Sequence, residues 1–265
     1  MPDSDKNRCF ICLENSPSLI QSGCACRGDA GRAHPDCRVK AAQALVKRKD
    51  WRWWFTCQTC EQEFTGAMCI ALTNAWWSQV RDRAEEDPER LAAAHNMANS
   101  FSQQAKHAEA EEMLREVLAV RKQVLGAEHP DTLAAAGNLA ISVSGQGKQA
   151  EAEEMEREVL PVLKQVLGAE HPDTLAAAHN LAISLVHQGK HAEAEEMQRE
   201  VLAVLKRVQG AEHPDTLTTE SHLARSLYSQ GKHAEVEEIQ REVLACRKRA
   251  VEGSGACADG CKRRK

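Results

Sequence analysis

The 265-residue chain is long enough to bury a hydrophobic core, and its net charge of -5 leaves no basic excess for binding nucleic acid. No stretch approaches the roughly 18 consecutive apolar residues of a membrane span, and the polar start MPDSDKNR lacks the apolar core of a signal peptide. We therefore expect a cytoplasmic protein with no membrane or nucleic-acid partner. In such a reducing compartment, clustered cysteines indicate metal binding before disulfides.

Composition divides the chain near residue 84. Eight of the ten aromatic residues and eight of the eleven cysteines lie in residues 1–83. The same segment carries 12 Lys and Arg against 9 Asp and Glu, whereas the remainder carries 22 against 30. The two parts therefore differ in kind, and we expect them to fold differently.

Potential metal ligands occur in four closely spaced pairs in the first part. Two residues between ligands let both side chains of a tight turn reach one ion, so each pair supplies half of a tetrahedral site. Four pairs predict two closed, structural zinc sites without metal catalysis. The eight predicted ligands are Cys9, Cys12, Cys24, Cys26, His34, Cys37, Cys57 and Cys60.

The order of four cysteines, one histidine and three cysteines, with one residue inside the second pair, resembles the RING-CH zinc finger over about residues 7–64. The PHD finger shares the ligand order and is the alternative. The resemblance implies a cross-brace, in which interleaved pairs bind two zinc ions. One ion would take Cys9, Cys12, His34 and Cys37, and the other would take Cys24, Cys26, Cys57 and Cys60.

Fingers of this family usually act as ubiquitin ligases that dock a ubiquitin-conjugating enzyme and form no covalent intermediate. Ile11 matches the apolar residue that many of them present to that enzyme. Two positions depart from the family pattern, because Ala41 replaces a common tryptophan and Glu61 follows the last ligand. The tryptophans at 51, 53 and 54 either restore a docking surface or pack around the second zinc and onto the next helix, and packing is the favoured interpretation.

Residues 65–86 are predicted to form a linking helix, because apolar residues recur there at three- and four-residue steps. After it, the motif HPDTL recurs at His129, His171 and His213, with DPERL at Asp87, which is a period of 42 residues. A fixed period of this size predicts a stacked array. Each unit reads as two helices separated by a Gln-Gly-Lys turn, since glycine accepts the left-handed conformation that ends a helix.

The period, the turn and the link GAEHPDT resemble tetratricopeptide repeats of the kinesin-light-chain type over about residues 87–252. The first copy departs from the pattern, because Ala105 replaces the turn glycine. The resemblance implies a groove, lined by the first helices, that holds a protein or peptide. Its predicted binding residues are Asn96, Asn99, Asn138, Ile141, His179, Asn180, Ile183, His187, Arg225 and Tyr228.

Two repeated residue types have alternative interpretations. The asparagines at 96, 138 and 180 either hydrogen-bond the backbone of a bound peptide or bridge neighbouring helices. The histidines at 129, 171 and 213 precede a proline at a helix start and have no ligand partner nearby in the sequence, so we interpret them as joint residues.

The predicted fold is mainly α, with a small two-zinc cross-brace finger joined to an all-α tetratricopeptide-repeat solenoid. The segments are a finger at 1–64, a linking helix at 65–86, four repeats at 87–252 and a disordered basic tail at 253–265. The terminal KRRK run leaves a nuclear location open.

Two functions fit this organisation. The first is a ubiquitin ligase, in which the finger docks the conjugating enzyme and the repeat groove holds the substrate. The second is a non-catalytic adaptor that binds one protein through the finger and another through the repeats. The sequence determines neither the conjugating enzyme nor the peptide.

Overall fold

The computed structural model of the chain describes residues 9–14, 19–21, 32–46, 51–57 and 59–245. The chain divides into two compact units, Met1–Gly126 and Ala127–Lys265, and each is described by itself. The predicted tail at 253–265 lies outside the described residues. No helix in the described ranges is both long and apolar enough to cross a membrane.

The first unit begins with small elements. Strand β1 (Ile20–Gln21) pairs antiparallel with β2 (Arg32–Ala33), so that Ile20 faces Ala33. Helix α1 (Pro35–Val46) follows directly, and a 3-10 helix, η3 (Trp51–Trp54), leads to a bridge between Thr56 and Glu63. Neither α1 nor the short strands were predicted from the sequence, because their stabilising contacts come from other parts of the chain.

Helix α2 (Gly66–Val80) joins this region to the first repeat. Trp76 of α2 stacks on Trp54 with ring centroids 6.0 Å apart, and its indole nitrogen donates a hydrogen bond to Glu89 at 3.2 Å. The helix is shorter than the predicted 65–86, because residues 81–86 are charged or small and offer no large apolar side chain to bury. Trp54 therefore packs onto α2, as the favoured interpretation stated, and its packing around the second zinc stays a prediction.

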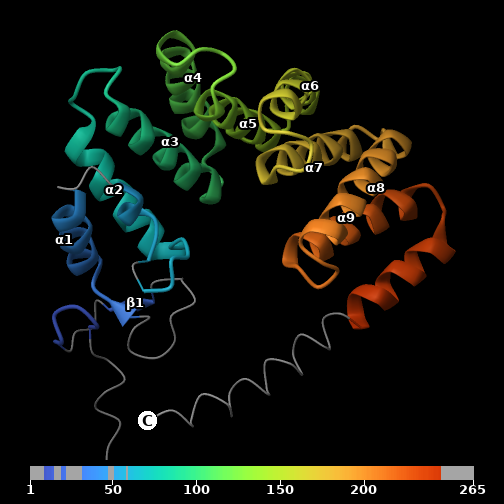
Figure 1. Ribbon diagram of the computed structural model, residues 1–265, viewed down its shortest axis with the longest axis horizontal. Coiled ribbons are helices and arrows are strands. Elements are labelled where there is room, and N and C mark those ends of the chain that lie inside the picture. Colours follow the sequence, from blue (N-terminus) through green and yellow to red (C-terminus); the bar gives the residue numbers. More distant parts are fainter. Residues whose placement is uncertain (1–8, 15–18, 22–31, 47–50, 58, 246–265) are drawn as a thin grey trace, which may run out of the picture. The chain divides into compact units, whose positions relative to one another are not determined.

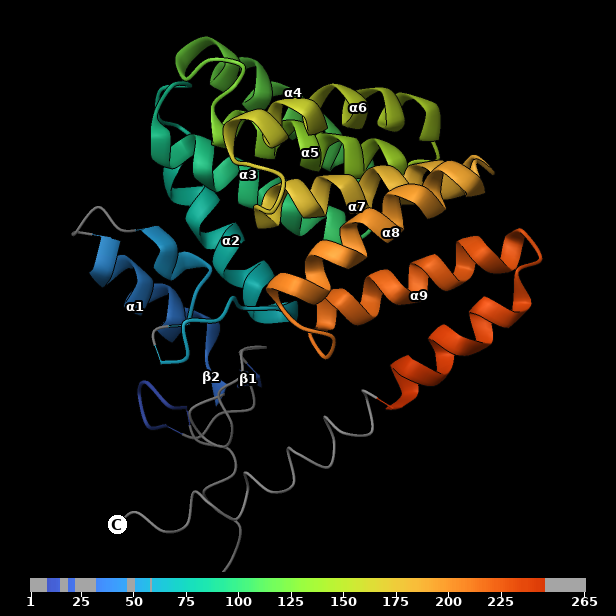
Figure 2. The same cartoon turned by 45° about the vertical axis from the view of Figure 1, so that its right-hand side comes forward.

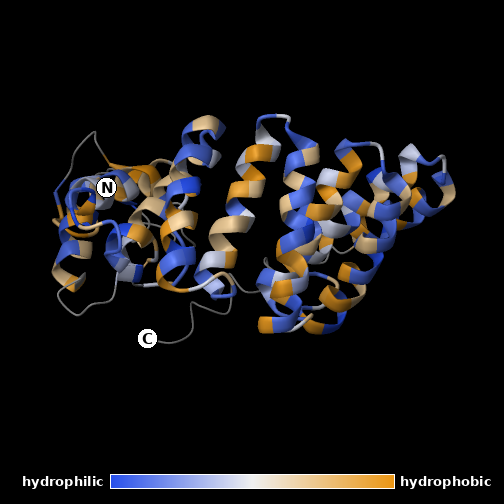
Figure 3. Cartoon of the chain, turned by 90° about the horizontal axis from the view of Figure 1, so that it is seen from above, coloured by the Kyte–Doolittle hydropathy of each residue, from blue (hydrophilic) through white to orange (hydrophobic). Residues whose placement is uncertain are grey.

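The repeats are helical hairpins, as predicted. In the first unit, α3 (Pro88–Gln103) pairs with α4 (His107–Val124). The second unit contains α5 (Pro130–Gly145), α6 (Gln149–Val166), α7 (Pro172–His187), α8 (His191–Val208), α9 (Pro214–Ser229) and a last helix at 233–245. Figures 1 and 2 show α7, α8 and α9 side by side, and Figure 3 shows both apolar and polar residues along each helix.

The repeated motif explains where the first helices begin. At His129, His171 and His213 the side chain caps the helix, since Nδ1 accepts a hydrogen bond from the backbone amide two residues later at 3.1–3.2 Å. Asp87 does the same in the first repeat, where it accepts from the amides of Glu89 and Arg90 at 2.9 Å. The proline that follows suits the first helical position, which needs no amide donor. The histidines are thus helix caps at the joints between repeats.

The Gln-Gly-Lys turn is held by a carboxylate of the preceding repeat. Glu153 on α6 accepts hydrogen bonds from Gln188 at 2.5 Å and from the Lys190 ammonium at 2.7 Å. Glu195 on α8 repeats the arrangement with Gln230 and Lys232. These pairs hold the pKa of Glu153 down to about 2, with the Lys190 hydrogen bond as the largest cause. The turn sequence therefore joins neighbouring repeats as well as the two helices of one hairpin.

Glu156 and Gln198 occupy equivalent positions on the second helices of the second and third repeats. Gln198 on α8 is buried and accepts a hydrogen bond from the Ser226 hydroxyl at 2.8 Å. The residue 42 positions earlier is Glu156, which is equally buried and whose Oε2 has no hydrogen-bond partner among the described residues. Burial raises the pKa of Glu156, the Ser184 hydroxyl offsets part of this effect, and the nearby Glu153 adds to it, so that the pKa is about 7. The second repeat thus carries an unfavourable buried carboxyl.

Ala105 adopts the left-handed conformation predicted for its turn, with φ +59°, where the equivalent Gly147, Gly189 and Gly231 have φ +83°, +76° and +76°. Replacing Ala105 with glycine should stabilise the chain by about 1 kcal/mol, because glycine has no Cβ to oppose this conformation. Denaturant unfolding followed by circular dichroism measures the gain. The reverse change, Gly189→Ala, should lose a similar amount, since an added Cβ there meets nothing within 4 Å and only the backbone conformation opposes it. An Ala105→Gly chain no more stable than the parent would contradict the strain.

Replacing Glu156 with glutamine should stabilise the chain at pH 8 by about 2 kcal/mol and leave its stability unchanged at pH 4. The folded-state pKa of Glu156 is raised from 4.5 to about 7, so its contribution is fully favourable below pH 4.5 and is lost as the pH rises through 7. Denaturant unfolding at several pH values measures the difference. The exposed Glu154→Gln serves as a control on the same helix. A gain that is equal at both pH values would exclude titration of Glu156 as its cause.

Candidate metal centre and repeat groove

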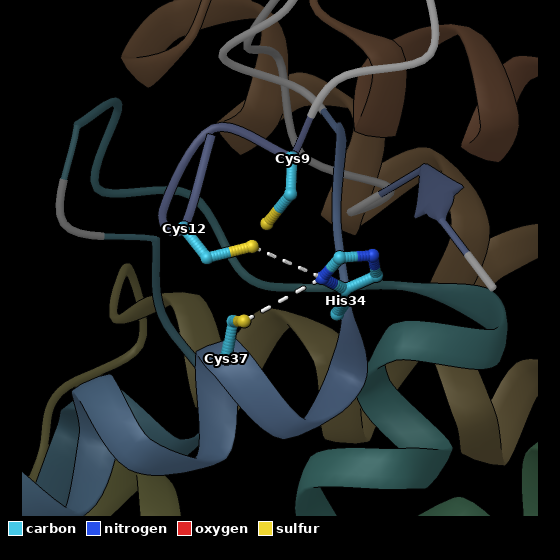
Figure 4. Close-up of side chains that lie close together, drawn as sticks. All are labelled: Cys9, Cys12, His34 and Cys37. Carbon is cyan, nitrogen blue, oxygen red and sulfur yellow. Dashed lines mark hydrogen bonds between the residues drawn. The ribbon is translucent and has the colours of Figure 1, made fainter. Parts of the chain in front are cut away.

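Four of the predicted ligands come together in the first unit. The ligand atoms of Cys9, Cys12, His34 and Cys37 all lie within 4.8 Å of one another, as Figure 4 shows. The Nδ1 atom of His34 lies 3.4 Å from Cys12 Sγ and 3.6 Å from Cys37 Sγ. Cys9 is buried, whereas Cys12 is exposed at the outer edge of the group.

Local backbone bonds place these four side chains. The amide of Leu13 donates to the carbonyl of Cys9 at 2.9 Å, which closes the turn that carries the first pair. The amide of Phe10 donates to the carbonyl of Arg32 at 3.0 Å and fixes this turn beside β2. His34 directly follows β2, and Cys37 lies three residues later in the first turn of α1. The Cys9–Cys12 turn, the end of β2 and the start of α1 therefore bring the four ligand side chains together.

The geometry and chemistry of the group fit a tetrahedral metal ion. Bonds of about 2.3 Å to sulfur and about 2.0 Å to nitrogen keep tetrahedral ligand atoms roughly 3.5–3.8 Å apart. The two distances from His34 agree with this spacing. Burial raises the pKa of the Cys9 thiol, but backbone hydrogen bonds from Cys12, His34 and Ile11 outweigh it and lower the pKa to about 6. Burial and the neighbouring Cys12 and Cys9 raise the pKa of the Cys37 thiol to about 12, so that metal binding would have to displace its proton. By its donor atoms and their spacing, the group can hold a metal ion.

The second predicted ligand set is only partly described. Cys57 is buried and Cys60 is partly buried, and the turn between them closes through a bond from the amide of Glu61 to the carbonyl of Cys57 at 2.8 Å. Cys24 and Cys26 lie outside the described residues. The second zinc site therefore stays a prediction.

An exposed apolar loop lies beside the metal group. Phe10 is 42% exposed, Ile11 37% and Leu13 56%, and all three belong to the turn that carries Cys9 and Cys12. The predicted docking residue Ile11 is thus accessible. Behind the loop, the buried guanidinium of Arg38 lies over the Phe10 ring, 5.7 Å from its centroid.

The predicted groove residues lie on the first helices of the repeats. In the first unit, Asn96 and Asn99 lie on α3, and the Asn96 amide donates to the Ala92 carbonyl of its own helix at 2.9 Å. In the second unit, most of the predicted side chains are accessible to different degrees: Asn138, His179, Asn180 and Ile183 are partly buried, and Ile141, His187, Arg225 and Tyr228 are exposed.

A cavity of about 200 Å³ opens between α7, α8 and α9 in the second unit. Its apolar wall comes from Leu175, Val201 and Leu205, and its polar rim includes the predicted groove residues His179 and Asn180. Further rim residues were not predicted from the sequence: Asp215, Thr218 and Thr219 come from α9, and Gln209 caps the C-terminus of α8. The sequence does contain a signal for Thr218, because this position departs from the repeat: the equivalent residue one 42-residue period earlier is an alanine.

A pair of histidines lies beside this cavity. The rings of His179 and His222 have centroids 4.7 Å apart, and His179 Nδ1 lies 3.4 Å from the Thr219 hydroxyl. Burial lowers the pKa of His222, and the charges of His179, Arg225 and His187 add to this effect, so that the pKa falls to about 4. Burial also lowers the pKa of His179, although Asp215 opposes the shift. Both rings are therefore neutral near pH 7 and offer hydrogen bonds instead of charge.

The chain matches the family model of the tetratricopeptide repeat at residues 89–165, 160–207 and 173–249. It is similar to the structure of a Podosopora anserina protein assigned as a kinesin light chain with nearly identical TPR-like repeats. Their identity is 26%, the match covers 82% of this chain and 96% of that one, and the TM-score is 0.59. The predicted repeats of kinesin-light-chain type are confirmed.

Two more distant structures share the fold. BtubC (BKLC) of P. vanneervenii has 15% identity and a TM-score of 0.61, with coverage of 83% of this chain and 90% of that one. PlcR of Bacillus thuringiensis, solved with the peptide PapR7 and DNA, has 12% identity and a TM-score of 0.55, with coverage of 84% and 73%. No match was found among the curated proteins.

The metal group should bind one ion per chain that depends on all four of its ligands. Cys37→Ser and His34→Ala should each lower the metal content of the full chain, purified under reducing conditions, by about one equivalent, since a tetrahedral site loses most of its affinity without a ligand. Elemental analysis measures the stoichiometry. Cys69→Ser is the matched control, because Cys69 lies on α2 beside Thr73, outside the group. Unchanged metal content in Cys37→Ser would contradict the site.

Proposed function

We propose that this chain, which belongs to the tetratricopeptide repeat family, is an adaptor that holds a segment of a partner protein in its repeat groove. Its amino-terminal part binds zinc and presents a finger to a second protein, for which we propose a ubiquitin-conjugating enzyme. The cavity between α7, α8 and α9 is the observation that carries the first half of this proposal.

The cavity suits one side chain of an extended peptide. At about 200 Å³ it is too small for a large ligand, and its apolar wall of Leu175, Val201 and Leu205 would cover an apolar side chain. The rim offers amides from Asn180 and Gln209, which can bond the peptide backbone on either side. PlcR, which shares the fold, was solved with a peptide, and this is consistent with peptide binding by such repeats.

Zinc is the metal that the ligand set favours. Three thiolates and one imidazole are soft ligands in a closed tetrahedral arrangement, which is typical of structural zinc sites. With four protein ligands no position remains for water or substrate, so the ion would stabilise the fold around the Cys9–Cys12 turn. Cys57 and Cys60, with Cys24 and Cys26, would hold a second zinc ion.

The exposed loop supports docking of a conjugating enzyme. Phe10, Ile11 and Leu13 form an accessible apolar surface on the turn that the metal would fix. Large apolar side chains held out to solvent on a rigid turn favour a protein contact over free exposure. The chain would then act by proximity, because the groove raises the effective concentration of a substrate lysine near the enzyme's thioester. It would need no catalytic residue of its own.

The groove is tested with peptides displayed on phage as random 12-residue sequences and selected on the full chain. Selected peptides should bind Asn180→Ala about tenfold more weakly than the parent, because that variant loses a backbone hydrogen bond in a partly buried site. Fluorescence anisotropy gives the affinities. Glu196→Ala, exposed on α8, is the control. Selected peptides that bind all three proteins equally would place the binding surface elsewhere.

The finger is tested by incubating the chain with activating enzyme, ubiquitin and a panel of conjugating enzymes. Ubiquitin chains should form with at least one enzyme, and Ile11→Ala should reduce the rate at least tenfold while leaving the bound metal unchanged. Leu244→Ala, an exposed apolar residue on the last helix, is the control. No transfer with any enzyme, or transfer insensitive to Ile11→Ala, would leave the non-catalytic adaptor as the function.

A further inference from the structure

In the second unit, the second helix of each repeat is covered by the first helix of the next. On α8, Leu202 is only 9% exposed and packs with Leu223 and Leu227 of α9. On α6, Leu160 at the equivalent position is 6% exposed and packs with Leu175 of α7. A hairpin of this type thus needs a neighbour to cover its second helix.

The last helix, at 233–245, has no such cover among the described residues. Leu244 stands 42 residues after Leu202, yet it is 54% exposed. It borders a depression with Glu237, Gln240 and Arg241, all of which are exposed. We define the end face as Ala234, Glu237, Gln240, Arg241 and Leu244. Of these, Glu237, Gln240 and Leu244 are equivalent to Glu195, Gln198 and Leu202, which are buried on α8.

The next part of the sequence does not continue the repeat. One period after His213, the motif HPDT is replaced by Gly255-Ala256-Cys257-Ala258. Residues 246–265 contain no Leu, Ile, Met, Phe, Trp or Tyr, and seven of these twenty residues are Lys or Arg. The segment therefore lacks the large apolar side chains that α9 uses to cover Leu202, and it is a poor occupant for the end face.

In the first unit, the first helix of the first repeat is covered. Helix α2 lies about 42 residues before α4 and packs on α3 as a second helix of a preceding repeat would. Leu72 of α2 and Leu114 of α4 stand at equivalent positions, and both are fully buried. The first helix of the first repeat is therefore already covered, and we consider a symmetric contact between two end faces.

The end face is complementary to itself. Ala234, Glu237, Arg241 and Leu244 recur at three- and four-residue steps and so share one side of the helix. In an antiparallel pair of such helices related by a two-fold axis near Ile239, Glu237 of each copy meets Arg241 of the other. The same register places the large Leu244 against the small Ala234. The same antiparallel arrangement therefore pairs opposite charges and places a large side chain against a small one.

We propose that a second copy of this chain covers the end face, so that two chains pair through their last helices in an antiparallel, two-fold contact. The helix is about 20 Å long, so the contact is small and its dissociation constant falls in the micromolar range. The dimer presents two repeat grooves and two metal groups, and a partner with two binding segments would gain avidity.

Sedimentation equilibrium of the metal-loaded full chain from 1 to 200 µM tests the proposal. The mass should approach twice 29.2 kDa at the upper concentrations. Leu244→Glu should raise the dissociation constant at least tenfold, whereas Val208→Glu, on α8 and 51% exposed, should leave it unchanged. A monomer throughout, a mass above two chains, or a dimer unaffected by Leu244→Glu overturns the proposal.

A charge exchange tests the register. Glu237→Arg alone and Arg241→Glu alone should each weaken the dimer, because like charges then meet across the axis. The double variant with both changes should restore it, since the two charges exchange places. A truncation after residue 245 should dimerise as the full chain does. Failure of the double variant to recover overturns the antiparallel register, and dimerisation that appears only on truncation identifies residues 246–265 as the occupant instead.

Discussion

The repeat region depends on the burial of one helix stripe by the following hairpin. Leu202 of α8 is buried because Leu223 and Leu227 of α9 pack against it. A lone hairpin would leave such residues in water, and burial of each large aliphatic side chain is worth about 1.5–3 kcal/mol. Stability therefore comes from neighbouring pairs, and the positions at the ends of the array need an arrangement of their own.

Because the packing repeats every 42 residues, a residue that differs between equivalent positions shows which property is specific to one repeat. Glu156 and Gln198 occupy the same buried place, but only the glutamine fits it without a charge cost. On the groove side the fourth repeat has His222 where the third has Asn180. The cavity between α7 and α9 is lined by Asn180 and by the imidazole of His179, on which the His222 ring packs.

The metal group and the first repeat share a hydrophobic core. The indole of Trp54, which follows α1 in the chain, stacks on Trp76 of α2, and Trp76 in turn bonds Glu89 at the start of α3. Composition alone separates a cysteine-rich part from the repeats near residue 84, but the compact unit extends from Met1 to Gly126. A change in the metal group therefore has a direct packing route to α3.

The sequence by itself determined the features that rest on local physics. The helix starts at His171 and His213, the positive φ of Ala105 and the pairing of Cys9 with Cys12 follow from capping, backbone sterics and ligand spacing within a few residues. The grouping of those cysteines with His34 and Cys37 came from resemblance to a known finger.

Only the tertiary structure decided what depends on contacts between distant residues. The end of α2 at Val80, the burial of Glu156 and the rim of Thr218 and Thr219 around the cavity could not be read from the pattern. Each depends on a neighbour from another helix, and the free energy of burial is set by that neighbour and not by the residue's own segment.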